Sequence, residues 1–250
     1  MMLASSPLFT AAGVRHGFST RRGGVSTDRY ATLNVGGKWG DDPENVERNR
    51  RRLAAAGGFP LEQLFTATQV HGARVAVVVE GVLRERVAAV EADALVTVVP
   101  ETTVGVYTAD CVPILFSDGD GRVAAAHAGW RGTVQGVASS TVEALVSVGA
   151  RRERIRAALG PSICARCFEV GDEVAAEFDR VVPSSVIRTA GEKPHIDLWE
   201  ANKVLLLDAG LRPELIDAAP PCTMCEKERF FSFRRDGANI GQHLSFVVAR

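Results

Sequence analysis

The sequence predicts an α+β fold of mixed β-sheets flanked by helices, in one domain that covers residues 1–250. Short β-rich runs bounded by turn residues occur at 64–70, 74–80, 94–99 and 103–108. An apolar pattern with helical spacing follows at 133–148. No internal repeat, low-complexity tract or linker interrupts the chain, so we expect strands and helices to share one core.

The composition is that of an ordinary globular protein, with 46% hydrophobic residues, 24% charged residues and a formal net charge of −1. This balance gives no field that would attract nucleic acid or an anionic membrane, so we expect neither as a partner. The first residues lack the pattern of an export signal, and no apolar run reaches membrane-spanning length. Five cysteines, an odd number, then indicate reduced thiols and a cytoplasmic location.

The first helix is predicted at residues 43–56. Asp42 is placed to cap it, Pro43 suits the first helical position, and Glu44 lies in the first turn. A Gly-Gly pair then ends the helix. After it, the extended run is broken at His71 and Gly72 before it resumes.

Two apolar runs within 107–132, joined by the polar turn 117–121, predict a central β-hairpin. Helix 133–148 should follow it. Towards the C-terminus we expect strands at 155–159, 230–233 and 244–248, and helices at 172–180 and 198–209. Asp197 would cap the last helix and Gly210 would close it.

Three residues that can ligate a metal lie close to the predicted strands. Cys111 belongs to the first strand of the hairpin, His127 to the second, and His71 to the break before 75–79. Two imidazoles and a thiolate suit zinc and leave a fourth position for water. The alternative is three unrelated residues, since a buried cysteine is often a small hydrophobe and a histidine often only serves a backbone partner.

Gly129-Trp130-Arg131-Gly132 reads as a turn that leads into a helix N-terminus. Free N–H groups, the positive end of the helix dipole and Arg131 would together favour a phosphate. The alternative is a tight strand-to-helix turn without a ligand, with Thr133 as the N-cap.

The other four cysteines form two C-x-x-C pairs, Cys164/Cys167 and Cys222/Cys225. Four thiolates can make a structural zinc site, but the long gap between the pairs favours ordinary reduced thiols. Pro221 to Cys225, preceded by His195 and Asp197, also imitates the signature of zinc nucleoside deaminases. It departs from that signature because an aspartate stands in place of the glutamate and a strand-like segment in place of the helix.

Eight motifs, taken in this order, resemble the laccase-domain, YfiH-like family of purine nucleoside phosphorylases. They are H-G-F-S-T-R, G-D-D-P-E-N-V, T-Q-V-H-G, A-D-A-L-V-T, T-A-D-C-V-P-I-L-F, A-A-H-A-G-W-R-G, L-G-P-S-I and F-F-S-F-R-R-D-G. The resemblance covers nearly the whole chain, and T-A-D-C and A-H-A-G-W-R-G are its most specific parts. The family is also labelled polyphenol oxidase and has been linked to peptidoglycan editing.

The resemblance implies a zinc held by His71, Cys111 and His127, with copper as the less favoured metal. It implies phosphorolysis of adenosine, inosine and S-methyl-5′-thioadenosine, with adenosine deamination alongside. The implied fold is a mixed α/β one, grouped with cysteine hydrolases. Purine nucleosides and phosphate would be the partners, and we expect a monomer or a weak homodimer.

Within that activity, Arg131 would hold phosphate and Asp110 would protonate or orient the purine. Gln69 would either bond a purine edge or serve as a buried structural amide. Further anion candidates, for each of which a surface salt bridge is the favoured interpretation, are Arg21, Arg50 and Arg234. Gln242 stands where the family commonly has arginine, which puts in doubt any substrate contact borrowed from that arginine. The family often has two adjacent cysteines where this chain has Arg166 and Cys167.

Three rival functions use overlapping residues. A metal-free cysteine hydrolase would use Cys111 as nucleophile and His127 or His71 as base, on an amide such as a peptidoglycan precursor. A copper-dependent polyphenol oxidase would need more ligands than five histidines spread along the chain provide. A non-enzymatic binding module would bind a substrate without turnover.

Overall fold

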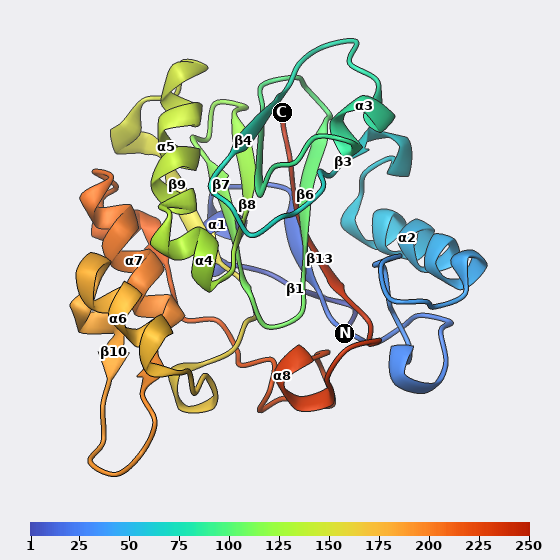
Figure 1. Ribbon diagram of the computed structural model, residues 1–250. Helices are drawn as coiled ribbons and strands as arrows, with labels where there is room; N and C mark the ends of the chain where they lie inside the picture. Colours follow the sequence, from blue (N-terminus) through green and yellow to red (C-terminus); the bar gives the residue numbers. More distant parts are fainter.

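Two mixed β-sheets pack face to face in the computed structural model, which describes residues 1–250 (Figure 1). The six-stranded sheet has the order β12 (Ile216–Asp217), β9 (Arg156–Leu159), β7 (Val112–Ser117), β8 (Val123–Ala128), β5 (Ala94–Thr97), β4 (Val75–Val78). The five-stranded sheet has the order β1 (Leu3–Ala4), β2 (His16–Ser19), β13 (His243–Val248), β6 (Thr103–Thr108), β3 (Leu64–Phe65). A separate two-stranded ribbon joins β10 (Val186–Ile187) to β11 (His195–Ile196). Both large sheets contain parallel and antiparallel pairs, so the predicted α+β fold with mixed sheets is confirmed.

Five helices cover the outer sides of the two sheets (Figure 1). They are α2 (Pro43–Gly57) on the five-stranded sheet and, on the six-stranded sheet, α4 (Trp130–Val134), α5 (Val137–Ser147), α6 (Asp172–Val181) and α7 (Leu198–Asp208). The short helices α1 (Pro7–Ala11) and α3 (Arg84–Ala88) pack against the core between the sheets, and α8 (Phe233–Asp236) has no buried residue. In Figure 1, α5, α6 and α7 lie on one side of the sheets and α2 on the other. None of these helices has the length and apolar character needed to cross a membrane.

The central hairpin is the predicted one. β7 and β8 pair antiparallel and all their residues are buried. Pro113 lies opposite His127, and Val112 lies opposite Ala128. Since Cys111 directly precedes β7, this register brings it to the same end of the sheet as His127.

Strand β13 contributes side chains to two cores, because successive side chains of a strand face opposite ways. Val247 packs between the two sheets with Val104 of β6 and Leu115 of β7. Phe246 faces outward and packs with Leu53 of α2. Burying each of these side chains contributes about 1.5–3 kcal/mol relative to leaving it exposed.

The outer face of the six-stranded sheet carries the largest core. Val142 of α5, Phe178 of α6 and Leu205 of α7 pack over a layer that includes Ile114 and Ala126. These helices therefore support the strands that carry Cys111 and His127 at one end.

The ends of α2 and α7 agree with the caps read from the sequence. The Asp42 carboxylate accepts a hydrogen bond from the Glu44 N–H at 2.8 Å, and Gly58 takes the left-handed conformation (φ 67°) after α2. The Asp197 carboxylate accepts from the N–H groups of Trp199 and Glu200 at the start of α7.

The helix expected at 133–148 is two helices. Gly136, with φ of 80°, breaks the chain between α4 and α5. Thr133 lies inside α4, where its N–H donates to the Gly129 carbonyl at 2.8 Å, so Thr133 is not an N-cap. The helical apolar spacing continues across the break because α4 and α5 pack on the same core.

Two expected strands are mostly irregular. At 64–70, only Leu64–Phe65 pairs with β6. At 230–233, Phe230 and Phe231 are fully buried without strand pairing. The N–H of Phe231 donates instead to Nε2 of His243 at 2.9 Å. The buried N–H of Phe231 is therefore satisfied by a side-chain acceptor, because no neighbouring strand offers a carbonyl.

Candidate active site

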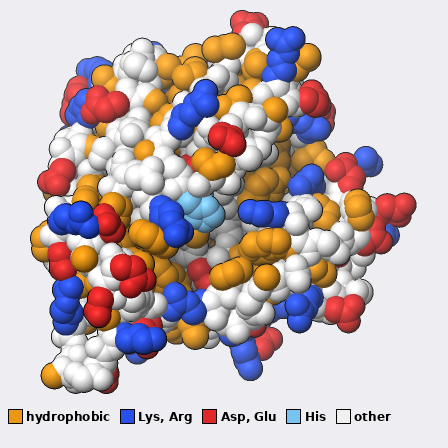
Figure 2. All heavy atoms as spheres, viewed as in Figure 1, with side chains coloured by type: hydrophobic (Ala, Val, Ile, Leu, Met, Phe, Trp, Pro, Cys, Tyr) orange, Lys and Arg blue, Asp and Glu red, His pale blue; other side chains and the backbone are white.

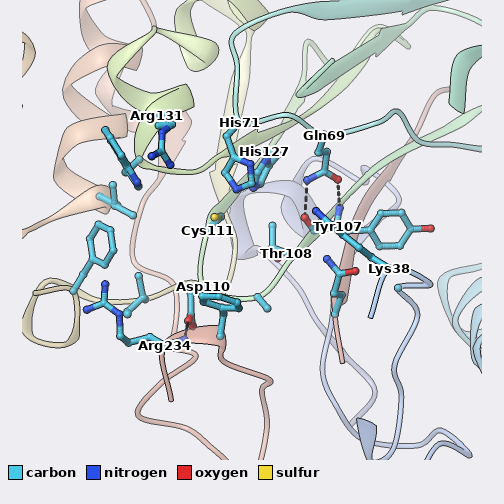
Figure 3. A pocket seen from close by; sticks show the side chains of 18 of the residues that line it. Lys38, Gln69, His71, Tyr107, Thr108, Asp110, Cys111, His127, Arg131 and Arg234 are labelled. Carbon is cyan, nitrogen blue, oxygen red and sulfur yellow. Dashed lines mark hydrogen bonds between the residues drawn. The ribbon is translucent and has the colours of Figure 1, made fainter. Parts of the chain in front are cut away.

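The structure brings His71, Cys111 and His127 together (Figure 3). Their ligand atoms all lie within 4.8 Å of one another. His71 lies in a turn between β3 and β4 with φ of 63°, Cys111 lies in the turn before β7, and His127 belongs to β8. The two imidazole rings lie edge to face, with centroids 4.7 Å apart.

A residue that sequence reasoning missed, Asp93, organises this trio. Its carboxylate accepts hydrogen bonds from the N–H groups of Val70 (3.1 Å), His71 (2.9 Å) and Gly72 (2.7 Å). It also accepts from Nδ1 of His127 at 2.8 Å. Asp93 is fully buried and directly precedes β5. The sequence signal was an aspartate immediately before a buried strand, in A-D-A-L-V-T.

The hydrogen bond between Nδ1 of His127 and Asp93 fixes the tautomer of His127. Because Nδ1–H donates to Asp93, the lone pair of Nε2 is left for a metal or a proton. The same carboxylate holds the turn that carries His71, so one buried charge positions both histidines. Burial raises the pKa of Asp93, but the His127 hydrogen bond and the backbone N–H donors outweigh it and lower that pKa.

The thiol of Cys111 is poised to lose its proton. Burial alone would raise its pKa, but the charge of His127 and hydrogen bonds with His127 and His71 bring that pKa down to about 6. Burial lowers the pKa of His127, and Cys111 and Asp93 reverse this and raise it to about 9. A thiolate flanked by two nitrogen donors is therefore the favoured state of the site.

Gly129 is required by the close approach of the trio. A Cβ atom at this position would lie 2.9 Å from Cδ2 of His71 and 3.1 Å from Sγ of Cys111. Any larger residue in A-H-A-G-W would therefore push the ligand atoms apart.

The trio opens on a cavity of about 950 Å³. Figure 2 shows a histidine in the hollow, with basic side chains on either side of it. Aromatic residues are among those that line it, and Trp39 and Phe233 lie against each other with ring centroids 5.8 Å apart. The basic residues that line it are Lys38, Arg131, Lys193 and Arg234. The cavity thus offers ring surfaces, cations and a candidate metal site within one space.

Arg131 lies at the edge of this cavity as the sequence predicted, but its helix is short. Its guanidinium lies over the ring of Trp130, 4.2 Å from the centroid, and no carboxylate pairs with it. Since α4 has five residues, the helix dipole adds little to any anion affinity. The charge of Arg131 itself remains the basis for an anion site.

Asp110 lines the cavity, and its carboxylate is committed to other partners. Oδ1 accepts from the Thr223 hydroxyl at 2.5 Å, and Oδ2 accepts from the Ser232 hydroxyl at 3.0 Å and the Arg234 N–H at 2.6 Å. In Figure 3 the carboxylate points towards Arg234 and away from Cys111. Burial raises the pKa of Asp110 against these hydrogen bonds. The residue ties the turn before β7 to the segment 223–234.

Gln69 is a structural amide. Its Nε2 donates to the Tyr107 carbonyl at 2.8 Å, and its Oε1 accepts from the Tyr107 N–H at 2.8 Å (Figure 3). Both ends of the amide are therefore occupied by the backbone of β6.

The favoured interpretation of three arginines as surface salt-bridge partners is wrong. Arg21 donates to the carbonyls of Ala31 and Lys227, and Arg50 donates to that of Val35. Arg234 donates to the Glu169 carbonyl at 2.8 Å and lines the cavity. Each of the three therefore connects neighbouring segments through their backbone carbonyl groups.

The resemblance to the deaminase signature does not correspond to a site. Asp197 is the cap of α7, and His195 pairs in β11. His195 is not among the residues that gather around Cys222 and Cys225.

Gln242 lines the cavity beside Gly36. Its N–H donates to the Asn34 side chain at 2.9 Å. An uncharged amide therefore lies at this part of the wall.

A family model described as multi-copper polyphenol oxidoreductase laccase matches residues 15–250. The chain is 42% identical over 231 residues to a purine nucleoside phosphorylase of Deinococcus radiodurans, covering 92% of this chain and 87% of that protein. It is 44% identical over 244 residues to adenosine deaminase RL5 of an unknown prokaryotic organism, covering 93% of each. It is 41% identical to purine nucleoside phosphorylase YfiH of Escherichia coli, covering 94% of this chain and 93% of that one.

Solved structures agree. YlmD from Geobacillus stearothermophilus superimposes with a TM-score of 0.89 at 36% identity, covering 98% of this chain and 94% of the other. YfiH of Bacillus licheniformis gives a TM-score of 0.89 at 32% identity, covering 95% and 93%. With the matching motifs, fold and family model, the chain belongs to the laccase-domain, YfiH-like family.

Proposed function

We propose that this chain is a zinc-dependent purine nucleoside phosphorylase acting on adenosine, inosine and S-methyl-5′-thioadenosine, with adenosine deaminase as a side activity. One observation carries the proposal: a metal-ligand trio, aromatic side chains and cations that include Arg131, which has no carboxylate partner, share a single cavity. Relatives that match over more than nine-tenths of this chain are named for these two activities.

Zinc fits the residues present. His71, Cys111 and His127 would hold it, since two imidazoles and a thiolate are a common zinc set that leaves a position open. The Asp93 bond behind His127 is the outer partner such sites use to orient a ligand. When bound, zinc would supply a Lewis acid and would lower the pKa of a water ligand towards neutrality.

The side chains around the trio would bind and orient the nucleoside. Trp39, Phe168 and Phe233 line the cavity, and a purine would pack against these aromatic side chains. In phosphorolysis, phosphate attacks C1′ of the ribose while the purine leaves, and positive charge builds on the sugar. The walls would exclude water from C1′, so that phosphate rather than water reaches it.

Arg131 would hold the attacking phosphate. It lines the cavity without a carboxylate partner, so its charge is available to an anion. Lys38 and Arg234 line the same cavity and would add positive charge. Asp110 would act by holding the turn that presents Cys111, and both activities would depend on it.

Product analysis tests the proposal. Adenosine is incubated with the purified protein, with and without phosphate, while bound zinc is quantified. We expect adenine release that needs phosphate, a smaller formation of inosine that does not, and about one zinc equivalent that depends on Cys111. Adenine release without phosphate would contradict the phosphorylase assignment, and full zinc in Cys111→Ala would contradict the ligand assignment.

A cysteine hydrolase is the second candidate, and the lowered pKa of Cys111 beside two imidazoles favours it. It predicts amide cleavage by metal-free protein and loss of that activity on alkylation of Cys111. Copper oxidation of phenols is less favoured, because only two of the five histidines join the trio. Phosphate-dependent turnover that is lost on zinc removal would exclude both.

A further inference from the structure

Four cysteines gather at a second place, outside the trio. The sulfur atoms of Cys164, Cys167, Cys222 and Cys225 all lie within 4.8 Å of one another. Residues 58 apart in sequence meet here, so the fold itself closes the gap that made the sequence favour unrelated thiols. Together with Cys111 in the trio, this cluster accounts for all five cysteines of the chain.

Each C-x-x-C pair lies in a turn that a backbone hydrogen bond closes. The N–H of Phe168 donates to the Cys164 carbonyl at 3.1 Å. The N–H of Glu226 likewise donates to the Cys222 carbonyl at 3.0 Å. Two turns, each carrying two cysteines, therefore bring their four sulfur atoms together.

Backbone hydrogen bonds hold the two turns together. The N–H of Ser162 donates to the Pro221 carbonyl at 3.2 Å, and the N–H of Thr223 donates to the Ser162 carbonyl at 3.0 Å. The N–H of Cys164 points at Sγ of Cys222, 3.3 Å away, and would be a donor to a thiolate there. The cluster is thus positioned by main chain and not by contact between the cysteines alone.

The spacing suits a metal better than a disulfide. Sγ of Cys167 and Sγ of Cys225 are 3.5 Å apart. Tetrahedral zinc, with Zn–S distances of about 2.3 Å, would hold its sulfur ligands about 3.8 Å apart. A disulfide needs about 2.05 Å, and all five cysteines are free thiols in the structure. Cys164 and Cys222 are buried and Cys225 is exposed, which leaves an access path from solvent.

We propose that Cys164, Cys167, Cys222 and Cys225 bind a structural zinc ion. Four sulfur ligands close the tetrahedron, so this ion would have no open position for a substrate or water, unlike the trio. An all-thiolate set also selects zinc over the hard cations magnesium and calcium.

The zinc would brace one wall of the cavity. The first turn leads directly to Phe168 and Glu169, which line the cavity. The second turn contains Thr223, whose hydroxyl donates to the Asp110 carboxylate. Loss of this zinc would therefore loosen the support of Asp110 without removing any residue of the trio.

The experiment compares zinc content in three proteins purified without added metal. They are the wild type, the Cys164→Ser/Cys225→Ser double variant, and Cys111→Ser as the matched control at the trio. We expect about two equivalents in the wild type and about one in the double variant. X-ray absorption at the zinc edge of Cys111→Ser should show a shell of sulfur only. The double variant should also melt at a lower temperature than Cys111→Ser, because the four-thiolate zinc links segments far apart in sequence.

Two equivalents retained by the double variant would overturn the proposal, and so would a wild type with a single equivalent that Cys111→Ser removes. Mass analysis of unreduced wild type that finds these cysteines in disulfides would overturn it as well. If the double variant does not fold, the zinc edge of Cys111→Ser still decides: nitrogen in the shell, or no zinc, refutes the site. None of these readouts depends on the proposed phosphorylase activity.

Discussion

At the scale of single residues, the site depends on a carboxylate behind the ligands. Asp93 accepts four hydrogen bonds, three from the turn of His71 and one from the His127 ring. An asparagine of the same shape could not accept all four, because its amide nitrogen donates. Losing some of these hydrogen bonds would leave both histidines less firmly oriented.

Asp93→Asn should therefore weaken metal affinity by about 10- to 100-fold, the usual effect of removing an outer partner of a ligand. Competition with a chromogenic chelator measures it. Asp118→Asn is the matched control, since Asp118 is also a buried aspartate but lies in the hairpin turn, paired with Arg122. Equal affinity in wild type and Asp93→Asn would remove Asp93 from the site.

Arg131 is the residue that separates the two proposed activities. Arg131→Ala should slow phosphate-dependent adenine release by about one to two decades, since a charge-assisted hydrogen bond is worth roughly 1.5–3 kcal/mol. Inosine formation needs no anion and should change far less. Rates of both products from adenosine provide the measurement, with Arg180→Ala, a change of an exposed arginine on α6, as control. Equal losses in both rates would make Arg131 a structural residue.

At the scale of elements, the important connection joins two loops. Asp110, in the turn between β6 and β7, accepts hydrogen bonds from Thr223, Ser232 and Arg234. Asp110 has a positive φ of 91°, which asparagine also tolerates, so Asp110→Asn changes the charge without backbone strain.

We expect Asp110→Asn to cost about 1–3 kcal/mol, because its amide cannot serve three donors, and to lower the rates of both activities. Thermal melting and the two product rates measure these effects. Thr223→Val removes one of the three hydrogen bonds and should show a smaller change in each. Normal stability with normal rates would show that the connection is unimportant.

At the scale of the whole molecule, a buried histidine makes stability depend on pH. His243 is buried on β13, and its Nε2 accepts from the Phe231 N–H. Burial, with a smaller effect of Arg21 and Arg235, lowers its pKa from 6.5 to about 3. The unfolded chain then binds a proton that the folded chain refuses, so stability falls as pH drops below 6.5 towards 3.

Between those values the His243 contribution to the free energy of unfolding should fall by up to about 1.4 kcal/mol per pH unit. His243→Gln keeps an acceptor for Phe231 and does not titrate, so its stability should fall less steeply. Urea unfolding of both proteins at about pH 7 and about pH 5 gives the comparison. An equal loss of unfolding free energy between the two pH values in both proteins would mean that His243 is protonated in the folded state.

The sequence alone determined the parts of this protein that depend on local chemistry. Asp42 and Asp197 cap α2 and α7 as expected, since a cap needs only the next few residues. The central hairpin followed from two apolar runs around a polar turn. His71, Cys111 and His127 were found because their residue types stand out next to strands and match a family's motifs.

Tertiary structure alone decided the contacts between distant segments. Asp93 reaches His127 across 34 residues, and Asp110 reaches Thr223 across 113. The break at Gly136 is local, but the apolar spacing that continues through it predicted one helix where the structure has two. The two C-x-x-C turns meet across 58 residues. The residue types indicate that such groups can bind one another or a metal, but they do not say which of them meet, because the distance between two side chains far apart in sequence is set by how sheets and loops pack.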